Sequence, residues 1–124
     1  MWERIVLIAI GGALGALSRY GLEGVVDGWR GPTVLGTFVV NISGALALGL
    51  LVGFTEDRVA FPALARTAIA IGFLGAYTTF STLMFETVEL AEGGSWATAA
   101  LNAAGSVAAG LAALYAGLVL GRSV

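Results

Sequence analysis

Residues 75–86 read Gly-Ala-Tyr-Thr-Thr-Phe-Ser-Thr-Leu-Met-Phe-Glu, and they lie inside an apolar stretch long enough to cross a membrane. A single aromatic side chain, Phe80, is surrounded there by four hydroxyl side chains: Thr78, Thr79, Ser81 and Thr82. A lipid-facing helix has no use for such a cluster, and polar groups at membrane depth normally line a protected or watery path. The stretch therefore indicates a protein that conducts something small.

The rest of the chain repeats the apolar pattern around this stretch. Four apolar segments, each close to the roughly 20 residues that a bilayer requires, cover residues 5–22, 33–54, 61–90 and 96–120. Residues 23–32 read as a polar loop. Short connections make successive helices antiparallel, which predicts both termini on one side. We expect an all-α membrane protein with one four-span domain over residues 1–124 and a broken third helix.

The composition excludes several classes of function. The chain has 124 residues, 58% of them hydrophobic and 11% charged, where a soluble domain would have about 25% charged residues. It has no Cys and no His, which removes disulfides, the usual zinc ligands and His-based nucleophile pairs. The net charge is −2 without a basic run, which argues against nucleic acid as a partner. The first segment does not read as a cleavable signal. No enzyme is predicted.

Glycine is frequent, at 19 residues, and several glycines recur at four-residue spacing, as in Gly11 and Gly15 or Gly117 and Gly121. Such rows let helix backbones approach closely in lipid. Packing within one four-helix unit explains most of them. Four helices enclose little volume, however, so a polar path would form more readily between two subunits, and we expect a dimer.

Polar residues within the other spans each have two interpretations. Arg19 could extend toward the lipid headgroups, or act as a vestibule cation that attracts anions. Asn41 could make an interhelical hydrogen bond, or donate to a dehydrated anion. Asn102 and Ser106, one turn apart in the fourth span, could hold helices together or donate to a path.

The third span leaves similar alternatives open. Gly72 and Gly75 precede the two threonines and favour a helix break, which would free carbonyl groups to surround a hard cation such as sodium. The alternative is a kink whose backbone groups are satisfied by Ser and Thr hydroxyls. Phe80 could pack, or turn its positive ring edge toward an anion. Glu86 could be an interfacial carboxylate near the far mouth of the path.

Three motifs together resemble those of the Fluc-type fluoride channels. They are Gly-Gly-x-x-Gly-Ala-x-x-Arg-Tyr from Gly11, Gly-Thr-x-x-Val-Asn-x-x-Gly from Gly36, and Gly-x-x-Thr-Thr-Phe-Ser-Thr from Gly75. The likeness covers essentially the whole chain. The resemblance implies a passive fluoride exporter in the cell's plasma membrane, built as an antiparallel, dual-topology dimer with two pores.

The resemblance also implies roles for individual residues. Asn41 would be the pore amide and Phe80 the first of two pore phenylalanines. Gly75 and Thr78 would give backbone carbonyls to a central sodium ion at the dimer axis. Arg19 would lie at the vestibule. Three further residues would belong to the polar track that leads fluoride onward: Thr82, Glu86 and Ser106.

Two features depart from the family pattern. Leu83 stands where the family usually has its second pore Phe, which predicts slower permeation or a heterodimer whose partner supplies the ring. The side of the termini holds four arginines, whereas the other side holds Arg30, with Arg19 approaching from within the first helix. This bias favours cytoplasmic termini and a fixed orientation. A homodimer remains the first expectation and a heterodimer the alternative.

Two other functions compete with the channel. A small multidrug-type exporter also has four short spans, but it needs a carboxylate within the first span, whereas Glu3 precedes residues 5–22 and Glu23 follows them. A purely structural subunit would explain the glycines but not the hydroxyl cluster around Phe80.

Overall fold

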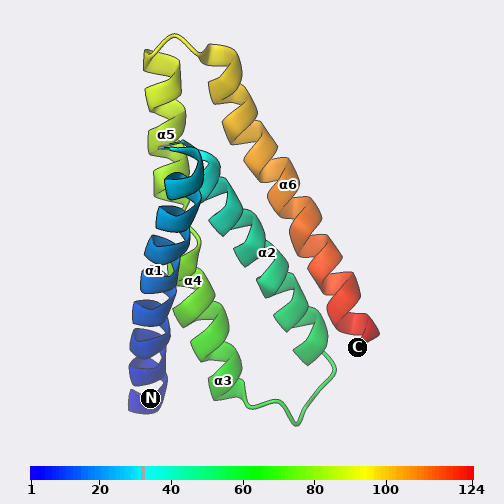
Figure 1. Cartoon of the computed structure of the whole chain (residues 1–124). Helices are drawn as coiled ribbons and strands as arrows, with labels where there is room; N and C mark the ends of the chain where they lie inside the picture. Colours follow the sequence, from blue (N-terminus) through cyan, green and yellow to red (C-terminus); the bar gives the residue numbers. More distant parts are fainter. Residues whose placement is uncertain (32) are drawn as a thin grey trace.

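The computed structural model describes residues 1–31 and 33–124, and the regular structure of these residues is helical. Two long helices begin the chain, α1 (Trp2–Arg30) and α2 (Leu35–Thr55). The third span is composed of α3 (Ala63–Thr67), the π-helix η1 (Ala68–Leu74), α4 (Gly75–Tyr77) and α5 (Phe80–Glu92). The last helix is α6 (Trp96–Ser123). Successive spans run in opposite directions, and both termini lie at the same end of the bundle (Figure 1).

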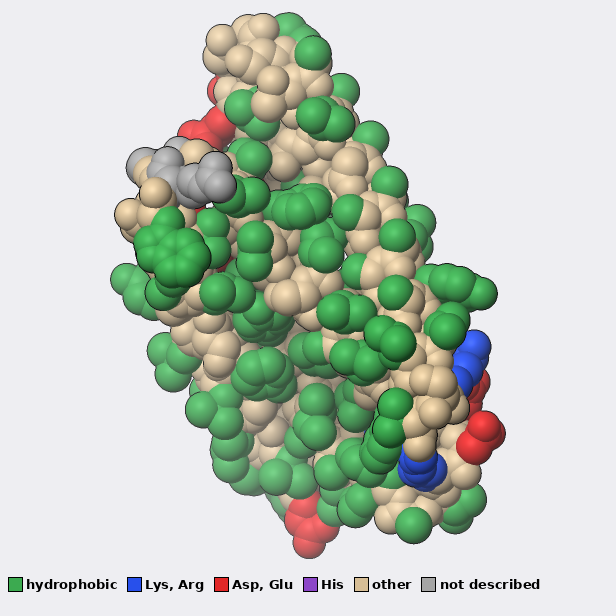
Figure 2. Space-filling view, turned by 45° about the vertical axis from the view of Figure 1, so that its right-hand side comes forward, with side chains coloured by type: hydrophobic (Ala, Val, Ile, Leu, Met, Phe, Trp, Pro, Cys, Tyr) green, Lys and Arg blue, Asp and Glu red, His purple; other side chains and the backbone are tan. Residues whose placement is uncertain are grey.

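Four helical stretches are long and apolar enough to cross a membrane. They are Trp2–Trp29, Leu35–Thr55, Ala63–Glu92 and Trp96–Ser123. The prediction of an all-helical chain with four spans is confirmed. The outer surface fits a lipid environment, because hydrophobic side chains cover most of the face seen in Figure 2 and the charged side chains gather toward the two ends.

The first helix is longer than the sequence analysis predicted. Residues 23–32 were expected to form a polar loop, but α1 continues through Glu23 and Asp27 to Arg30. The two carboxylates and Arg19 follow one another at four-residue spacing, so they share a face of the helix and do not interrupt it. The helix ends at Gly31, whose φ of 80° favours glycine and whose N–H donates to the Asp27 carbonyl at 2.6 Å. The side chain of Arg30 and residue Pro32 lie outside the described part.

Glycines fix the two closest helix pairs. α2 packs chiefly against α6, and α1 packs chiefly against η1. A Cβ atom on Gly49 or Gly53 of α2 would overlap a carbonyl oxygen of α6, and one on Gly117 or Gly121 of α6 would overlap a carbonyl oxygen of α2. Only glycine permits this reciprocal approach of two backbones. The four-residue spacing therefore indicated packing within one subunit correctly.

The α1–η1 pair uses the same device. A Cβ on Gly15 would overlap the Phe73 carbonyl, and one on Gly11 would press on the Ala68 carbonyl oxygen. The facing segment is a π-helix, an element that is rare and often found near functional sites. Both helix pairs are thus held by close backbone contact, and the α1–η1 contact attaches the third span to the first helix.

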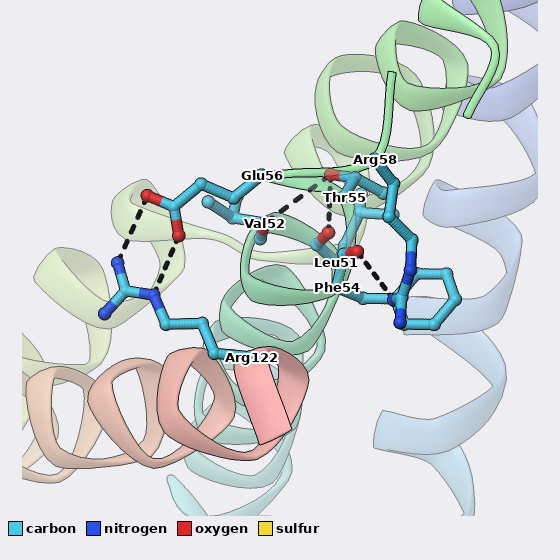
Figure 3. A network of polar contacts seen from close by, with 7 residues as sticks. All are labelled: Leu51, Val52, Phe54, Thr55, Glu56, Arg58 and Arg122. Carbon is cyan, nitrogen blue, oxygen red and sulfur yellow. Dashed lines mark hydrogen bonds and ion pairs between the residues drawn. The ribbon is translucent and has the colours of Figure 1, made fainter. Parts of the chain in front are cut away.

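Polar contacts tie the ends of α2 and α6 together (Figure 3). Arg122 donates to both Glu56 carboxylate oxygens, at 2.7 and 3.2 Å. Arg58 donates to the Phe54 carbonyl at 2.8 Å, and its guanidinium lies 3.8 Å from the centroid of the Phe54 ring. The Arg122 guanidinium holds the pKa of the Glu56 carboxyl below its ordinary value of 4.5, first by hydrogen bonding and then by its charge.

Candidate functional site

The site is centred on an extended two-residue segment between α4 and α5. Thr78 has φ −82° and ψ 153°, and Thr79 has φ −143° and ψ 114°, so both leave the helical conformation. The Thr78 hydroxyl and N–H both donate to the Leu74 carbonyl, at 3.0 and 3.1 Å. The Thr79 hydroxyl accepts from the Thr82 N–H at 3.3 Å and caps the start of α5. We refer to these two residues below as the extended segment.

Asn41 of α2 pairs with the backbone of the extended segment. Its side-chain nitrogen donates to the Thr79 carbonyl at 3.0 Å, and its side-chain oxygen accepts from the Thr79 N–H at 2.7 Å. Of the two interpretations left open for Asn41, the structure shows the interhelical hydrogen bond. One N–H of the amide is left over, because an Asn side chain carries two donors.

Two neighbouring contacts join α2 to the third span on either side of this pair. The Ser43 hydroxyl lies 2.8 Å from the Tyr77 hydroxyl, and it donates to the Val40 carbonyl at 3.1 Å. Farther along, the Thr37 hydroxyl donates to Glu86 Oε1 at 2.7 Å. Together with Asn41 these contacts give three polar links from α2 to the third span.

A cavity of about 300 Å³ lies beside the extended segment. Its lining brings together three of the predicted site residues: Asn41, Gly75 and Thr78. Its other walls are mostly apolar and come from α2, η1 and α6, including Leu48, Leu74 and Leu114. The predicted pore amide and both predicted sodium ligands therefore share one space.

Glu86 lies at the wider end of the site, away from this cavity. It lines a cavity of about 610 Å³ together with Asp27 and Glu89. The second oxygen of Glu86 is buried without a hydrogen-bond partner among the described residues. Glu86 is more than an interfacial carboxylate, because its Oε1 atom accepts a hydrogen bond from Thr37 of α2.

Asn102 and Ser106 of α6 lie together, as their spacing predicts, and both are buried at 9% and 6% exposure. Asn102 donates to the Thr87 hydroxyl of α5 at 3.0 Å, so it connects the two helices. The Ser106 hydroxyl has no partner among the described residues. Both residues line a cavity of about 330 Å³ between α2 and α6 that also includes Phe38.

The two predicted aromatic positions have opposite surroundings. Phe80 is 72% exposed on the subunit surface, whereas Leu83 is 6% exposed and packs inside. Thr82 is close to the extended segment, since its hydroxyl accepts from the Thr79 hydroxyl at 3.0 Å. Phe80 is therefore available to a neighbouring subunit or to lipid, and Leu83 is available to neither without rearrangement.

Arg19 lies on α1, on the row that also carries Glu23 and Asp27. Its Nε atom is buried without a hydrogen-bond partner in the described part of the chain, as are Glu23 Oε1 and Asp27 Oδ1. Because α1 continues past Glu23, that carboxylate lies within the first span. The argument from its position against a multidrug-type exporter therefore fails.

Sequence reasoning assigned no role to Thr37, Ser43 or Thr87, although each binds a polar partner across two helices. Thr37 precedes Asn41 by four residues, so the helical repeat puts both on one face. That spacing was readable in the sequence. The partners of Ser43 and Thr87 depend on the register between helices, which no local pattern gives.

In the described part of the chain, four membrane-length helices, one of them interrupted by a polar extended segment, define a small multi-pass membrane protein. The family model described as "CrcB-like protein, Camphor Resistance (CrcB)" matches residues 6–118. The chain belongs to this family. Membership of this family, rather than the position of Glu23, distinguishes the chain from a multidrug-type exporter.

Curated relatives match over nearly their full length. A fluoride-specific ion channel FluC of Nitratidesulfovibrio vulgaris strain Miyazaki F is 46% identical, covering 98% of this chain and 99% of the relative. Proteins of the same name from Maridesulfovibrio salexigens and Magnetococcus marinus are 43% and 41% identical over 98% of this chain, covering 98% and 99% of those proteins.

Proposed function

We propose that this chain is a fluoride-specific ion channel that lets fluoride leave the cytoplasm passively across the plasma membrane. Its full-length similarity to relatives named fluoride-specific ion channels carries the proposal. The chain is a channel rather than an enzyme. Hydrogen fluoride enters through lipid and dissociates in the more alkaline cytoplasm, and the trapped anion then leaves through the channel, driven by the membrane potential.

Fluoride is small and holds its water strongly, so a path must replace that shell with donors. The proposed ion path uses the remaining N–H of Asn41, the ring edge of Phe80, the hydroxyls of Thr82 and Ser106, and Asn102, with Leu83 and Glu86 also on it. Arg19 would attract the anion at the vestibule. The partnerless Ser106 hydroxyl supports this assignment, because a buried hydroxyl normally has a partner.

The proposed channel is an antiparallel dimer. Its support is the 72% exposure of Phe80, which lies next to the extended segment on the surface of a single subunit. An aromatic residue assigned to an ion path must be enclosed when the path is complete. A second subunit would enclose it, so the pores would be completed by the two subunits together.

We also propose that the extended segment is the helix break at which a structural sodium ion binds. Hard cations prefer oxygen ligands such as backbone carbonyls. In an unbroken helix the Thr79 N–H would donate to the Gly75 carbonyl, whereas here it donates to Asn41. Gly75 and Thr78 line the same cavity, and their carbonyl oxygens are the kind of ligand that suits the ion. Bound there, sodium would supply positive charge that holds the two subunits together.

Whether the partner subunit is a second copy of this chain depends on how the chain is oriented in the membrane. Arg4, Arg58, Arg66 and Arg122 all lie on the side of the termini, which favours one fixed orientation. A C-terminal tag tested for accessibility from each side of the membrane distinguishes the cases. Equal amounts of both orientations would support a dual-topology homodimer. A single orientation would require an oppositely oriented partner chain.

Fluoride efflux from liposomes that contain only this protein, followed with a fluoride electrode, tests the function. The parent should release fluoride and retain chloride. Phe80→Ile should slow efflux about two- to twelvefold if the ring edge contributes about 0.5–1.5 kcal/mol, as contacts between aromatic pairs do. Phe85→Ile is the matched control, because Phe85 is also exposed on α5 but turns to another side. Folded parent protein that releases no fluoride would contradict a self-sufficient channel.

A further inference from the structure

Asn41 binds two consecutive peptide units of the third span. Its oxygen accepts from the Thr79 N–H, which belongs to the peptide unit of the Thr78 carbonyl. Its nitrogen donates to the Thr79 carbonyl, which belongs to the peptide unit of the Phe80 N–H. Each unit is planar and trans, so a bond to one end of it fixes the direction of the other end.

We propose that Asn41 is a positioning residue that directs the Thr78 carbonyl toward the sodium site, in addition to any contact with the anion. The N–H and C=O of a trans peptide point in opposite directions. Holding the Thr79 N–H on the Asn41 side-chain oxygen therefore turns the Thr78 carbonyl away from that oxygen. This inference rests on the proposed sodium site.

The same bond acts on the second proposed sodium ligand. The Thr79 N–H is the donor that an unbroken helix would give to the Gly75 carbonyl. Asn41 takes this donor at 2.7 Å and so leaves the Gly75 carbonyl without its helical partner. One side chain on α2 thereby influences both carbonyls.

Asparagine suits this task better than its near relatives. The two bonds require one acceptor and one donor on a short side chain, and the carboxamide presents both as a peptide group does. The partners also determine the orientation of the amide, because an N–H needs the oxygen and a carbonyl needs the nitrogen. Aspartate would keep the acceptor and lose the donor, and alanine would lose both.

The backbone partner of this pairing is buried. Thr79 is 7% exposed, and Val40, next to Asn41, is fully buried. Gly44 lies one turn beyond Asn41, and a Cβ there would overlap the Thr78 methyl group. Because Thr79 is buried, removal of the Asn41 amide should leave the backbone groups of Thr79 without a protein partner.

The test measures two properties of the full chain: amide hydrogen exchange at Thr79 by NMR, and the sodium concentration that gives half-maximal fluoride efflux. Asn41→Ala should speed exchange at Thr79 at least about tenfold and raise the half-maximal sodium concentration severalfold. Asn41→Asp should keep Thr79 protected, because its carboxylate still accepts from the N–H. A loss of folded protein alone would lower the maximal efflux without moving the half-maximal sodium concentration.

Ser43→Ala is the matched control. Ser43 also links α2 to the third span, but through the Tyr77 side chain, so its removal should change neither measurement. If Asn41→Ala lowers efflux while Thr79 exchange and the sodium dependence stay at parental values, Asn41 is an anion ligand only and the proposal is wrong. A parent without fluoride efflux would overturn the proposed function instead, and the exchange result would then decide on the pairing by itself.

Discussion

The Thr37 hydroxyl of α2 holds one carboxylate oxygen of Glu86 on α5 at 2.7 Å, and the other oxygen of Glu86 has no partner among the described residues. This hydrogen bond restricts the Glu86 side chain, which could otherwise adopt several rotamers, beside the cavity of about 610 Å³. In the described part of the chain, it is the side-chain hydrogen bond that joins α2 to α5. The orientation of Glu86 therefore depends on a residue outside its own helix.

Replacing Thr37 with Val should release Glu86 with little change in shape. We expect a loss of about 1–2 kcal/mol in the free energy of unfolding, because both carboxylate oxygens would lack a partner. Fluoride efflux should fall about fivefold if orienting Glu86 contributes about 1 kcal/mol. Unfolding in detergent and electrode-measured efflux check the two effects. Thr55→Val is the control, since the Thr55 hydroxyl bonds to carbonyls of its own helix. Equal effects of the two changes would contradict the assignment.

Replacing Gly49 with Ala should separate α2 from α6. The new methyl group would overlap the Leu114 carbonyl, a backbone atom that no rotamer change can move. We expect a destabilisation of about 1–3 kcal/mol. Gly110→Ala is the matched control, since its methyl would lie 3.9 Å from the Ile42 side chain and should be neutral or stabilise by about 0.5–1 kcal/mol. Thermal unfolding followed by tryptophan fluorescence distinguishes them. Similar melting temperatures for the two variants would contradict close α2–α6 packing.

Replacing Leu83 with Phe should have opposite effects on flux and stability. A ring at this position restores the second aromatic group of the family pattern, so efflux per folded channel should rise. Leu83 is 6% exposed, however, and a larger side chain must displace its neighbours at about 1–3 kcal/mol. Leu83→Met preserves the volume and should change neither property much. Fluoride efflux normalised to folded protein tests this prediction. A value for Leu83→Phe no greater than the parent's would contradict the proposed role of this position.

Removing the Glu56 charge should affect stability in one pH range. The pKa of Glu56 is lowered in the folded protein, so its pairing with Arg122 stabilises the fold above the ordinary pKa of 4.5 and loses this effect as the pH falls through the lowered value. Glu56→Gln should therefore lower the melting temperature slightly at pH 7 and not below the lowered pKa. High salt should reduce the difference at pH 7, because both groups are largely exposed. A difference that persists unchanged in acid would contradict this explanation.

The sequence predicted the four spans because hydropathy follows directly from the residues. It misplaced the end of α1, since Glu23 and Asp27 read as loop residues although their spacing with Arg19 suits a helix. Gly93 and Gly94 form the turn before α6, where the φ of 87° at Gly94 favours glycine. The π-helix η1 was not predicted from the sequence, and in the structure it packs chiefly against α1.

The residue types of the candidate site could be predicted from the sequence, but their hydrogen-bond partners could not. Asn41 and the threonines stood out as polar residues in apolar spans. The pairing of Asn41 with the Thr79 backbone depends on how α2 is aligned with a span almost forty residues later, which no periodicity contains. The same is true of Leu83 and Phe80, whose opposite exposure is determined by the packing of α5.

The partnership of α2 with α6 has a consequence for biogenesis. The glycines of α2 pack against the backbone of α6, which is synthesised well after α2, and α1 likewise packs against η1, which also follows later in the chain. Neither of the first two spans can complete its packing when it leaves the translocon. The polar residues of α2 therefore enter the bilayer before their partners exist, and the chain must tolerate an interval of unpaired insertion. The α2–α6 pair can form only after α6 has been inserted, so the arrival of α6 completes the packing that α2 began without a partner.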